Sequence, residues 1–403
     1  MQESLKKFFV VVVAVVLMML PANKMMAGQV ELGVERTQEY DNLLQGKRVG
    51  LLTNQTGVDS KLISTVDRLQ AKYNLTAVFV PEHGFYGAIA AGEEFNNATF
   101  KGLTVYSLYG DNKHPSAEML QNIDVLCVDL QDIGVRHYTY VSTMAYAMEA
   151  CAAAGKPVIV FDRPNPLGGE VDGPVLKPQF KTFIGLYELP LRHGLTIGEY
   201  ARYINEHEQI KCALTVIPMK HWKRSMQWRD TGLPWVSTSP LIPTSETAAL
   251  YAATGVAGDT NLSVGVGTAK PFYYVGAPFV DEYEVYRALT ALQINGVAFR
   301  PAAFIPRYGS YSGQLVKGVE IYLLQPEKVN TSELGYLLVH TLQKLYPEKL
   351  LFPKREYAEG YKADIALGED SLRLQEEPAA VFSRWQQEDA AFKKQVQPYL
   401  LYK

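Results

Sequence analysis

The feature that most constrains the fold is a purely apolar run, residues 77–80, that stops abruptly at Pro81. The run lacks polar alternation, which is typical of a strand buried on both faces of a parallel sheet. Glu82 and His83 follow directly, and Gly84 comes next. The carboxyl ends of the strands in an open parallel sheet form the edge where ligands bind. The sequence therefore predicts an acid beside a base at a ligand-binding edge.

Similar apolar runs alternate along the chain with patterns typical of helices. Helices are expected over residues 142–154 and 196–207, and Thr196 with Glu199 predicts a capping box at the start of the second. Strands that alternate with helices of this length indicate βαβ units, and hence an α/β fold with a parallel sheet. The expected strands cover residues 48–52, 76–80, 124–130, 158–161 and 214–218.

The length of 403 residues favours two domains, preceded by a targeting segment. Lys6 and Lys7 precede an apolar stretch at 8–20, so residues 1–27 are predicted to be a cleaved signal peptide that directs secretion or periplasmic export. The apolar stretch is too short to span a bilayer comfortably, so no membrane span is expected in the mature chain. We expect a catalytic domain over 28–255 and a smaller domain over 256–403, because a region rich in glycine and small residues begins there.

The smaller domain is expected to contain both helices and a strand. Its expected helices lie near residues 282–292, 332–345 and 385–399, and its expected strand lies near 314–324.

Composition and missing motifs exclude several functional classes. The formal net charge is −3, so no basic surface suggests a nucleic-acid partner. Cys127, Cys151 and Cys212 lack metal-ligand spacing and are expected to be buried thiols. The chain has no Walker loop, no dinucleotide-binding glycine fingerprint and no His-Glu-x-x-His motif, so neither a cofactor nor a metal is expected.

Polar residues follow each expected strand and would converge at one edge of the sheet. Each also has a purely structural interpretation: Asn54 can cap a turn, Asp129 can cap a helix or pair with Arg136, and Asp162 can pair with Arg163. His137 is expected to be a packed or surface histidine. We predict catalytic roles for Glu82, His83 and Asp129, and substrate-binding roles for Asn54, Gln131, Arg136, Tyr138, Asp162, Arg163, Asn165 and Glu246.

Carboxylates beside aromatic side chains favour a sugar substrate. Glycoside hydrolysis uses an acid that protonates the leaving oxygen and a second carboxylate, unless the acetamido group of the substrate replaces the latter. Glu82 is the predicted acid. The sequence leaves the second group open among Asp129, Asp162, Glu93 and Glu246. The aromatic residues expected near the edge are Tyr86, Tyr106, Tyr109, Tyr138 and Tyr140.

Several ordered sequence blocks resemble the bacterial exo-β-N-acetylmuramidases of the NamZ type, a glycoside hydrolase family. They are GLLTN at 50–54, PEHG at 81–84, VYSLYG at 105–110, DLQDIGVRHYTY at 129–140, DRPNP at 162–166, HGLTIGE at 193–199, PF at 271–272 and GAP at 276–278. The resemblance implies a Rossmann-like N-terminal domain with the site in its cleft, and a smaller α+β auxiliary domain. It also implies release of N-acetylmuramic acid from the non-reducing ends of peptidoglycan fragments, with Glu82 at the position of the family's proposed catalytic glutamate. The lactyl carboxylate of such a substrate needs a cation, and Arg136 or Arg163 would suit.

The chain departs from the family pattern at three positions near the expected domain junction. Leu241, Val264 and Val266 stand where the family usually has asparagine, glutamate and arginine. These departures leave open a different peptidoglycan fragment as substrate. Val264 and Val266 also motivate an alternative, a non-catalytic periplasmic protein that binds muropeptides or sugars on the same fold.

Overall fold

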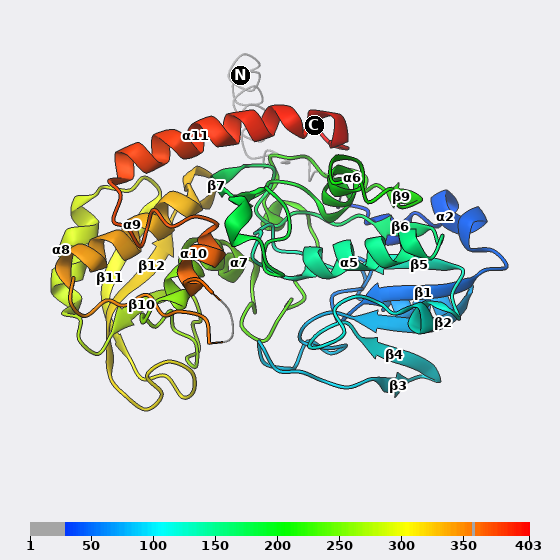
Figure 1. The fold of residues 1–403 in the computed structure, drawn as a ribbon, viewed down its shortest axis with the longest axis horizontal. Helices are drawn as coiled ribbons and strands as arrows, with labels where there is room; N and C mark the ends of the chain where they lie inside the picture. Colours follow the sequence, from blue (N-terminus) through cyan, green and yellow to red (C-terminus); the bar gives the residue numbers. More distant parts are fainter. Residues whose placement is uncertain (1–28, 357–358) are drawn as a thin grey trace, which may run out of the picture.

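The computed structural model describes residues 29–356 and 359–403, so the predicted signal peptide at 1–27 lies outside the described residues. The chain forms two parts that lie side by side, each built on its own sheet (Figure 1). The strands of the larger part run from the blue to the green region of the ribbon, and those of the smaller part are mainly yellow. This arrangement agrees with the α/β architecture that the sequence predicts.

The N-terminal part contains a seven-stranded sheet with the order β3-β4-β2-β1-β5-β6-β9. Six strands are parallel, and only the edge strand β3 runs antiparallel to its neighbour. All five expected strands are confirmed, whereas β3 and β4 had no counterpart in the sequence prediction. The bounds are β1 Arg48–Thr53, β2 Asn74–Val80, β3 Ala98–Phe100, β4 Leu103–Ser107, β5 Val125–Asp129, β6 Val158–Phe161 and β9 Leu214–Ile217.

Helices cover both faces of this sheet, which explains why its central strands are apolar without alternation. In β5, Leu126 and Val128 join the hydrophobic cluster that includes α5 and α6, whereas Val125 and Cys127 join the cluster on the other face with α2 and α3. The helices of this part are α2 Thr37–Leu44, α3 Thr65–Gln70, α4 Ala117–Leu120, α5 Tyr140–Ala153 and α6 Ile197–His207.

Two local predictions are confirmed. Thr196 Oγ1 accepts a hydrogen bond from the Glu199 N–H at 3.2 Å, and the Glu199 carboxylate accepts one from the Thr196 N–H at 3.1 Å, which completes the capping box of α6. Cys127, Cys151 and Cys212 are all buried and free. Burial raises the pKa of the Cys212 thiol to about 11 and that of Cys151 to about 12, so both remain protonated at neutral pH.

The C-terminal part packs helices against a three-stranded antiparallel sheet with the order β10-β12-β11. The expected helices and strand of this part are confirmed. The predicted domain boundary follows residue 255. Helix α7 ends just before that boundary, but it packs against α9 and so belongs to the C-terminal part by its contacts. The elements are α7 Ser245–Thr254, β10 Tyr274–Ala277, α8 Glu282–Ala291, β11 Val297–Phe304, β12 Val316–Leu323, α9 Thr331–Leu345, α10 Lys362–Leu367 and α11 Pro378–Gln395.

The long helix α11 and the tail after it tie the two parts together. Figure 1 shows α11 (red) running along the top of the molecule over both parts. It packs against the hairpin of β7 (Asp172–Val175) and β8 (Pro190–Arg192), and the tail then returns to the first sheet. There the Leu401 N–H donates to Glu199 at 2.9 Å and the Tyr402 hydroxyl donates to Asp162 at 2.5 Å. One hydrophobic cluster continues from α5 to α9 and α11, so the parts share a core.

No helix within residues 29–356 or 359–403 combines the length and apolar character that crossing a bilayer requires.

Candidate active site

A cavity of about 500 Å³ lies at the carboxyl end of β2, where the two parts of the chain meet. Glu82 and His83 line it from the N-terminal part, whereas Tyr251 and Phe272 line it from the C-terminal part. This volume lies within the range usual for small-molecule sites. The prediction that Glu82 and His83 reach a ligand-binding edge therefore agrees with the structure. The aromatic side chains that line the cavity are those of Tyr109, Tyr138, Phe183, Tyr251, Phe272 and Tyr308.

The Glu82 carboxylate is held by hydrogen bonds at both oxygens. The Gly92 N–H donates to Oε1 at 3.1 Å, and the Thr139 hydroxyl donates to Oε2 at 2.6 Å. Thr139 is the residue just before α5, so the start of that helix fixes the carboxylate. Burial and the neighbouring Glu82 charge both raise the pKa of Tyr109, which keeps this phenol protonated as a donor toward the carboxylate. Glu82 is 9% exposed and faces the cavity with a fixed orientation.

Two residues of the cavity wall adopt a left-handed backbone that side chains disfavour. His83 has φ 70° and Phe272 has φ 70°. Such conformations cost of order 1 kcal/mol or more and persist where surrounding contacts enforce them. At His83 these contacts are a 2.8 Å hydrogen bond between Nδ1 and the Ile89 carbonyl and a 3.3 Å bond from the Ile89 N–H to the His83 carbonyl. The turn after β2 is therefore built around His83, which supports the cavity wall as well as lining it.

His137 also lines the cavity, although the sequence predicted a packed or surface residue. Its ring stacks on Tyr251 with centroids 4.9 Å apart, and Gly255 leaves room for it, because a Cβ there would lie 2.7 Å from Nε2. Burial and the Arg136 charge lower the pKa of His137 to about 3, so the ring is neutral. Both ring nitrogens are buried and lack a hydrogen-bond partner among the described residues, so His137 contributes mainly its ring face and packing to the wall.

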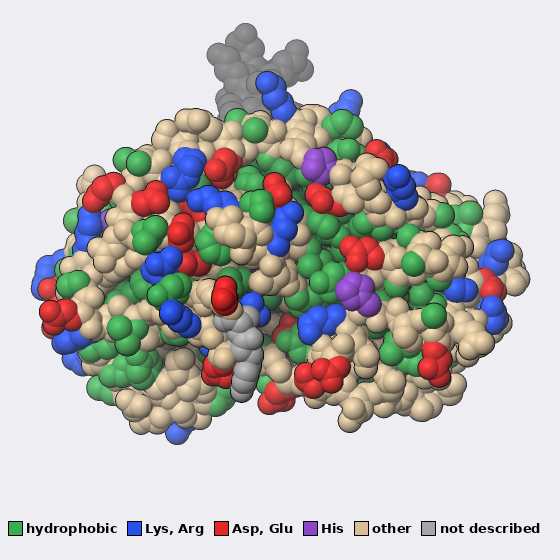
Figure 2. Space-filling model, in the orientation of Figure 1, with side chains coloured by type: hydrophobic (Ala, Val, Ile, Leu, Met, Phe, Trp, Pro, Cys, Tyr) green, Lys and Arg blue, Asp and Glu red, His purple; other side chains and the backbone are tan. Residues whose placement is uncertain are grey.

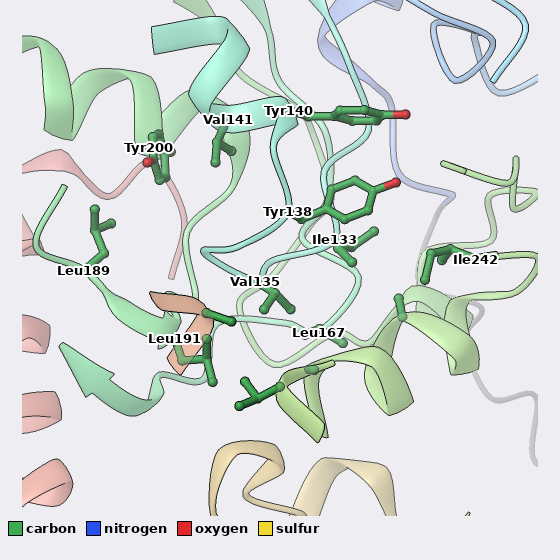
Figure 3. Close-up of a cluster of buried hydrophobic side chains, with 14 of the residues drawn as sticks. Ile133, Val135, Tyr138, Tyr140, Val141, Leu167, Leu189, Leu191, Tyr200 and Ile242 are labelled. Carbon is green, nitrogen blue, oxygen red and sulfur yellow. The ribbon is translucent and has the colours of Figure 1, made fainter. Parts of the chain in front are cut away.

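Tyr138, just before α5, and Tyr140, the first residue of α5, extend in the same direction, and Figure 3 shows both hydroxyls on the side of Ile242. The Tyr138 hydroxyl donates to Thr238 Oγ1 at 2.9 Å, and the Tyr140 hydroxyl donates to the Thr238 carbonyl. Tyr138 lines the cavity, in agreement with its predicted position, whereas Tyr140 lies behind it and is fully buried. These bonds hold residues 238–242 against the cavity.

Asp259 is a second acidic side chain on the cavity wall, and the sequence analysis missed it. It is the last residue of the short helical turn Val256–Asp259 in the C-terminal part. Burial raises the pKa of Asp259 to about 6, opposed by the positive charge of Lys362. Within the described part of the chain, Glu82 and Asp259 are the carboxylic side chains that line this cavity. No apolar strand precedes Asp259, so the signal that marked Glu82 is absent there.

Asp129 does not line this cavity. Its side chain is fully buried and forms a bidentate ion pair with Arg163, at 2.5 Å from Nε to Oδ1 and 2.9 Å from Nη2 to Oδ2. The Thr65 hydroxyl donates to the same carboxylate, and Arg163 also donates to the Val58 carbonyl at 2.6 Å. This arrangement contradicts the catalytic role predicted for Asp129 and the substrate-binding role predicted for Arg163. The two residues join the ends of β5 and β6 to the loop after β1.

The Arg136 guanidinium likewise donates its hydrogen bonds to groups of the protein. Its guanidinium donates to the carbonyls of Pro174 at 2.8 Å, Leu189 at 2.5 Å and Leu367 at 2.5 Å. Burial lowers the pKa of Arg136 to about 9. The expectation that Arg136 or Arg163 meets a substrate carboxylate is therefore corrected, because Arg136 instead joins the β7–β8 hairpin to α10.

The other predicted residues at the strand ends form a buried polar layer beneath the cavity. Asn54 accepts hydrogen bonds from Thr56, and Gln131 donates to the carbonyls of Asp132 and Pro164. Asp162 accepts from Thr196 and Tyr402, while Asn165 shapes a turn by accepting from the Leu167 N–H and donating to the Leu195 carbonyl. Burial raises the pKa of Asp162 to about 7. None of Asn54, Gln131, Asp162 and Asn165 lines the Glu82 cavity, and their hydrogen bonds within the protein favour structural roles over the predicted substrate-binding ones.

Glu246 and the three departures from the family pattern lie at different depths. Glu246 is exposed and lines a separate hollow with Trp228 and Leu324, which contradicts its predicted place in the site. Leu241 lines the cavity itself, whereas Val264 is buried in the core and Val266 is partly buried. An apolar side chain therefore occupies a position on the cavity wall where the family usually has an amide.

The residues that the structure describes contain no group of three or more His, Cys, Asp or Glu side chains arranged to hold a metal ion.

Comparisons with known proteins agree with this architecture. The family model described as "Exo-beta-N-acetylmuramidase NamZ, N-terminal" matches residues 49–246, and the corresponding C-terminal model matches residues 249–402. A curated relative, the peptidoglycan beta-N-acetylmuramidase NamZ of Bacillus subtilis (strain 168), is 46% identical over 319 residues, which cover 78% of this chain and 77% of that protein.

Two solved structures of DUF1343 family proteins from Bacteroides fragilis share the fold. The first has a TM-score of 0.84 and 36% identity, and the second has a TM-score of 0.75 and 28% identity. Each alignment covers 93% of this chain and 99% of the other. The likeness therefore extends across both parts of the molecule.

Proposed function

Because the chain belongs to the NamZ exo-β-N-acetylmuramidase family, we propose that it releases N-acetylmuramic acid from the non-reducing ends of peptidoglycan fragments. The observation that carries this proposal is a fixed carboxyl group, Glu82, on the wall of an aromatic-lined cavity of about 500 Å³. Aromatic faces suit the apolar faces of a sugar ring, and the fixed carboxyl group suits work on a glycosidic bond.

Glu82 is the general acid of the proposed reaction. It donates its proton to the glycosidic oxygen as the bond from that oxygen to the anomeric carbon breaks. Thr139 and Gly92 hold the carboxyl group in place throughout, so its approach to the oxygen is fixed before the substrate arrives. His83 positions the turn that carries Glu82, and the His137 ring supports the cavity wall by stacking on Tyr251.

Asp259 supplies the second carboxyl group of the proposed reaction. It lines the same cavity from the opposite part of the chain, and its pKa of about 6 leaves it largely ionised at neutral pH. An ionised carboxylate there can stabilise the positive charge that develops on the sugar ring, or activate the incoming water. The candidates Asp129 and Asp162 are engaged elsewhere, which favours Asp259.

A further proposal concerns where the enzyme acts, and it rests on the signal-peptide pattern of residues 1–27. We propose that residues 1–27 direct export and are removed, so that the enzyme meets peptidoglycan fragments in the periplasm or the medium. Mass spectrometry of the N-terminus of the exported protein tests this step, and an intact Met1 in the exported form would refute it.

The test of the activity uses a chromogenic N-acetylmuramide and the disaccharide of N-acetylmuramic acid and N-acetylglucosamine. Glu82→Gln should abolish most of the turnover, whereas Glu246→Gln should leave it unchanged, because Glu246 lies on a separate hollow. Absence of product from both substrates with folded wild-type protein would refute the proposal.

One observation favours a second candidate, a binding protein without catalysis. Leu241 replaces a polar family residue on the cavity wall itself. This candidate predicts saturable binding of muropeptides by calorimetry without turnover, and an affinity that Glu82→Gln leaves unchanged.

A further inference from the structure

A second cavity of about 500 Å³ adjoins the Glu82 cavity at the junction of the two parts. Phe183, Ile184 and Asp259 line both cavities, so the two are direct neighbours. Its walls carry three basic side chains, Lys113, Arg355 and Lys362, and we call this lining the cationic annex. Figure 2 shows Lys and Arg side chains gathered along this junction among acidic ones.

The basic side chains of the cationic annex are not neutralised by direct ion pairs. Lys113 donates to the Gly110 carbonyl at 2.6 Å and lies 5.5 Å above the Phe183 ring. Across residues 29–356 and 359–403, none of the three basic groups lies within 4.0 Å of a carboxylate. Two acidic residues, Asp259 and Glu356, also line the cavity, so it retains an excess of positive charge. Free cations beside a cavity attract an anionic group of a ligand.

The substrate of the proposed reaction carries an anionic group on its sugar ring. N-acetylmuramic acid differs from N-acetylglucosamine by a lactyl ether that ends in a carboxylate, and in muropeptides this arm continues into a peptide with carboxylates of its own. Arg136 and Arg163 were expected to bind this carboxylate, but their guanidinium groups donate to Leu189 and to Asp129 of the protein instead. Any cation that binds this carboxylate while the sugar ring lies at Glu82 is therefore expected elsewhere on the cavity walls.

We propose that the cationic annex binds the carboxylate at the end of the lactyl arm, whether that is the lactyl group itself or a peptide extension. The inference rests on the proposed function, because it places the sugar ring in the Glu82 cavity. Phe183 and Ile184 form the apolar ledge between the cavities, against which the methyl group of the arm packs. The annex thereby selects muramic acid over glucosamine, through binding rather than through the bond-breaking step.

The test compares two chromogenic substrates, the N-acetylmuramide and its carboxamide, in which the lactyl carboxylate is neutral. Lys113→Gln combined with Arg355→Gln should raise KM for the acid about 10-fold with little change in kcat, as expected for loss of partly exposed charge pairs. Lys362 is left in place because its charge acts on Asp259. KM for the carboxamide should not respond. Lys47→Gln is the matched control, because Lys47 is exposed and precedes β1 at the opposite edge of the sheet.

A third substrate, the N-acetylmuramyl dipeptide glycoside, separates the two sources of the carboxylate. A larger KM effect on the dipeptide than on the free acid assigns the annex to the peptide, and the reverse assigns it to the lactyl group. Equal KM changes for the acid and the carboxamide, or none for either acid substrate, would overturn the inference.

A calorimetric arm keeps failure of the inference separate from failure of the proposed function. If the wild-type protein hydrolyses none of the substrates, the proposed function fails. The methyl glycosides of N-acetylmuramic acid and of its carboxamide then still probe the annex by calorimetry. Tighter binding of the acid, lost in the double variant, supports the annex, and equal binding of the two glycosides refutes it.

Discussion

Variants of the ion pair between Asp129 and Arg163 can distinguish a structural role from a catalytic one, because the first predicts lost stability and the second lost turnover. Asp129 is 0% exposed and Arg163 is 4% exposed, and two short contacts join them. Asp129→Ala would leave the Arg163 guanidinium buried without a counter-charge. Removing one partner of a buried pair typically costs about 3–5 kcal/mol, because the remaining charge keeps its desolvation penalty. We therefore expect the Asp129→Ala variant to lose about that much free energy of unfolding.

The assay is urea denaturation of Asp129→Ala, of Arg163→Ala and of the double variant. The double variant should lose less free energy of unfolding than the sum of the two single losses, because each single change leaves the other charge buried and unpaired. Turnover per folded molecule, measured well below the unfolding transition, should stay close to the wild-type value. Normal stability with turnover reduced by orders of magnitude would refute the reasoning and restore Asp129 to the active site.

Three further predictions concern the cavity itself. Glu82→Gln should lower kcat about 10²- to 10⁴-fold, measured with the chromogenic muramide, because it removes general acid catalysis; Glu246→Gln is the control. The wild-type kcat/KM should rise with pH through about 6 as Asp259 ionises, and this rise should vanish in Asp259→Asn; an unchanged profile would exclude the ionised role. In the unfolded chain His137 takes up a proton near its ordinary pKa of 6.5, whereas in the folded protein its pKa is about 3. Between pH 6.5 and 3 the unfolded state therefore binds more protons, and the free energy of unfolding falls as the pH drops. His137→Gln should flatten this loss in thermal melts at several pH values, and an unchanged slope would contradict the assignment.

Local patterns in the sequence predicted much of the N-terminal part. Runs without polar alternation identified the strands, because both faces of the parallel sheet are covered by helices. Thr196 and Glu199 predicted the capping box, which involves only neighbouring residues. Strands β3 and β4 lie at the sheet edge and bury less, and β4 alternates exposed and buried positions, so they gave no comparable signal.

The sequence by itself determined that Glu82 and His83 follow a buried strand at the ligand-binding edge, because strand pattern and chain order fix that position. Only the tertiary structure decided which polar side chains face the cavity. Asp129 and Arg163 also end strands at this edge, but contacts from distant loops bury them as a pair. Asp259 and Lys362 instead reach the cavities from the C-terminal part, which packs over the sheet edge through long-range contacts that no local pattern encodes.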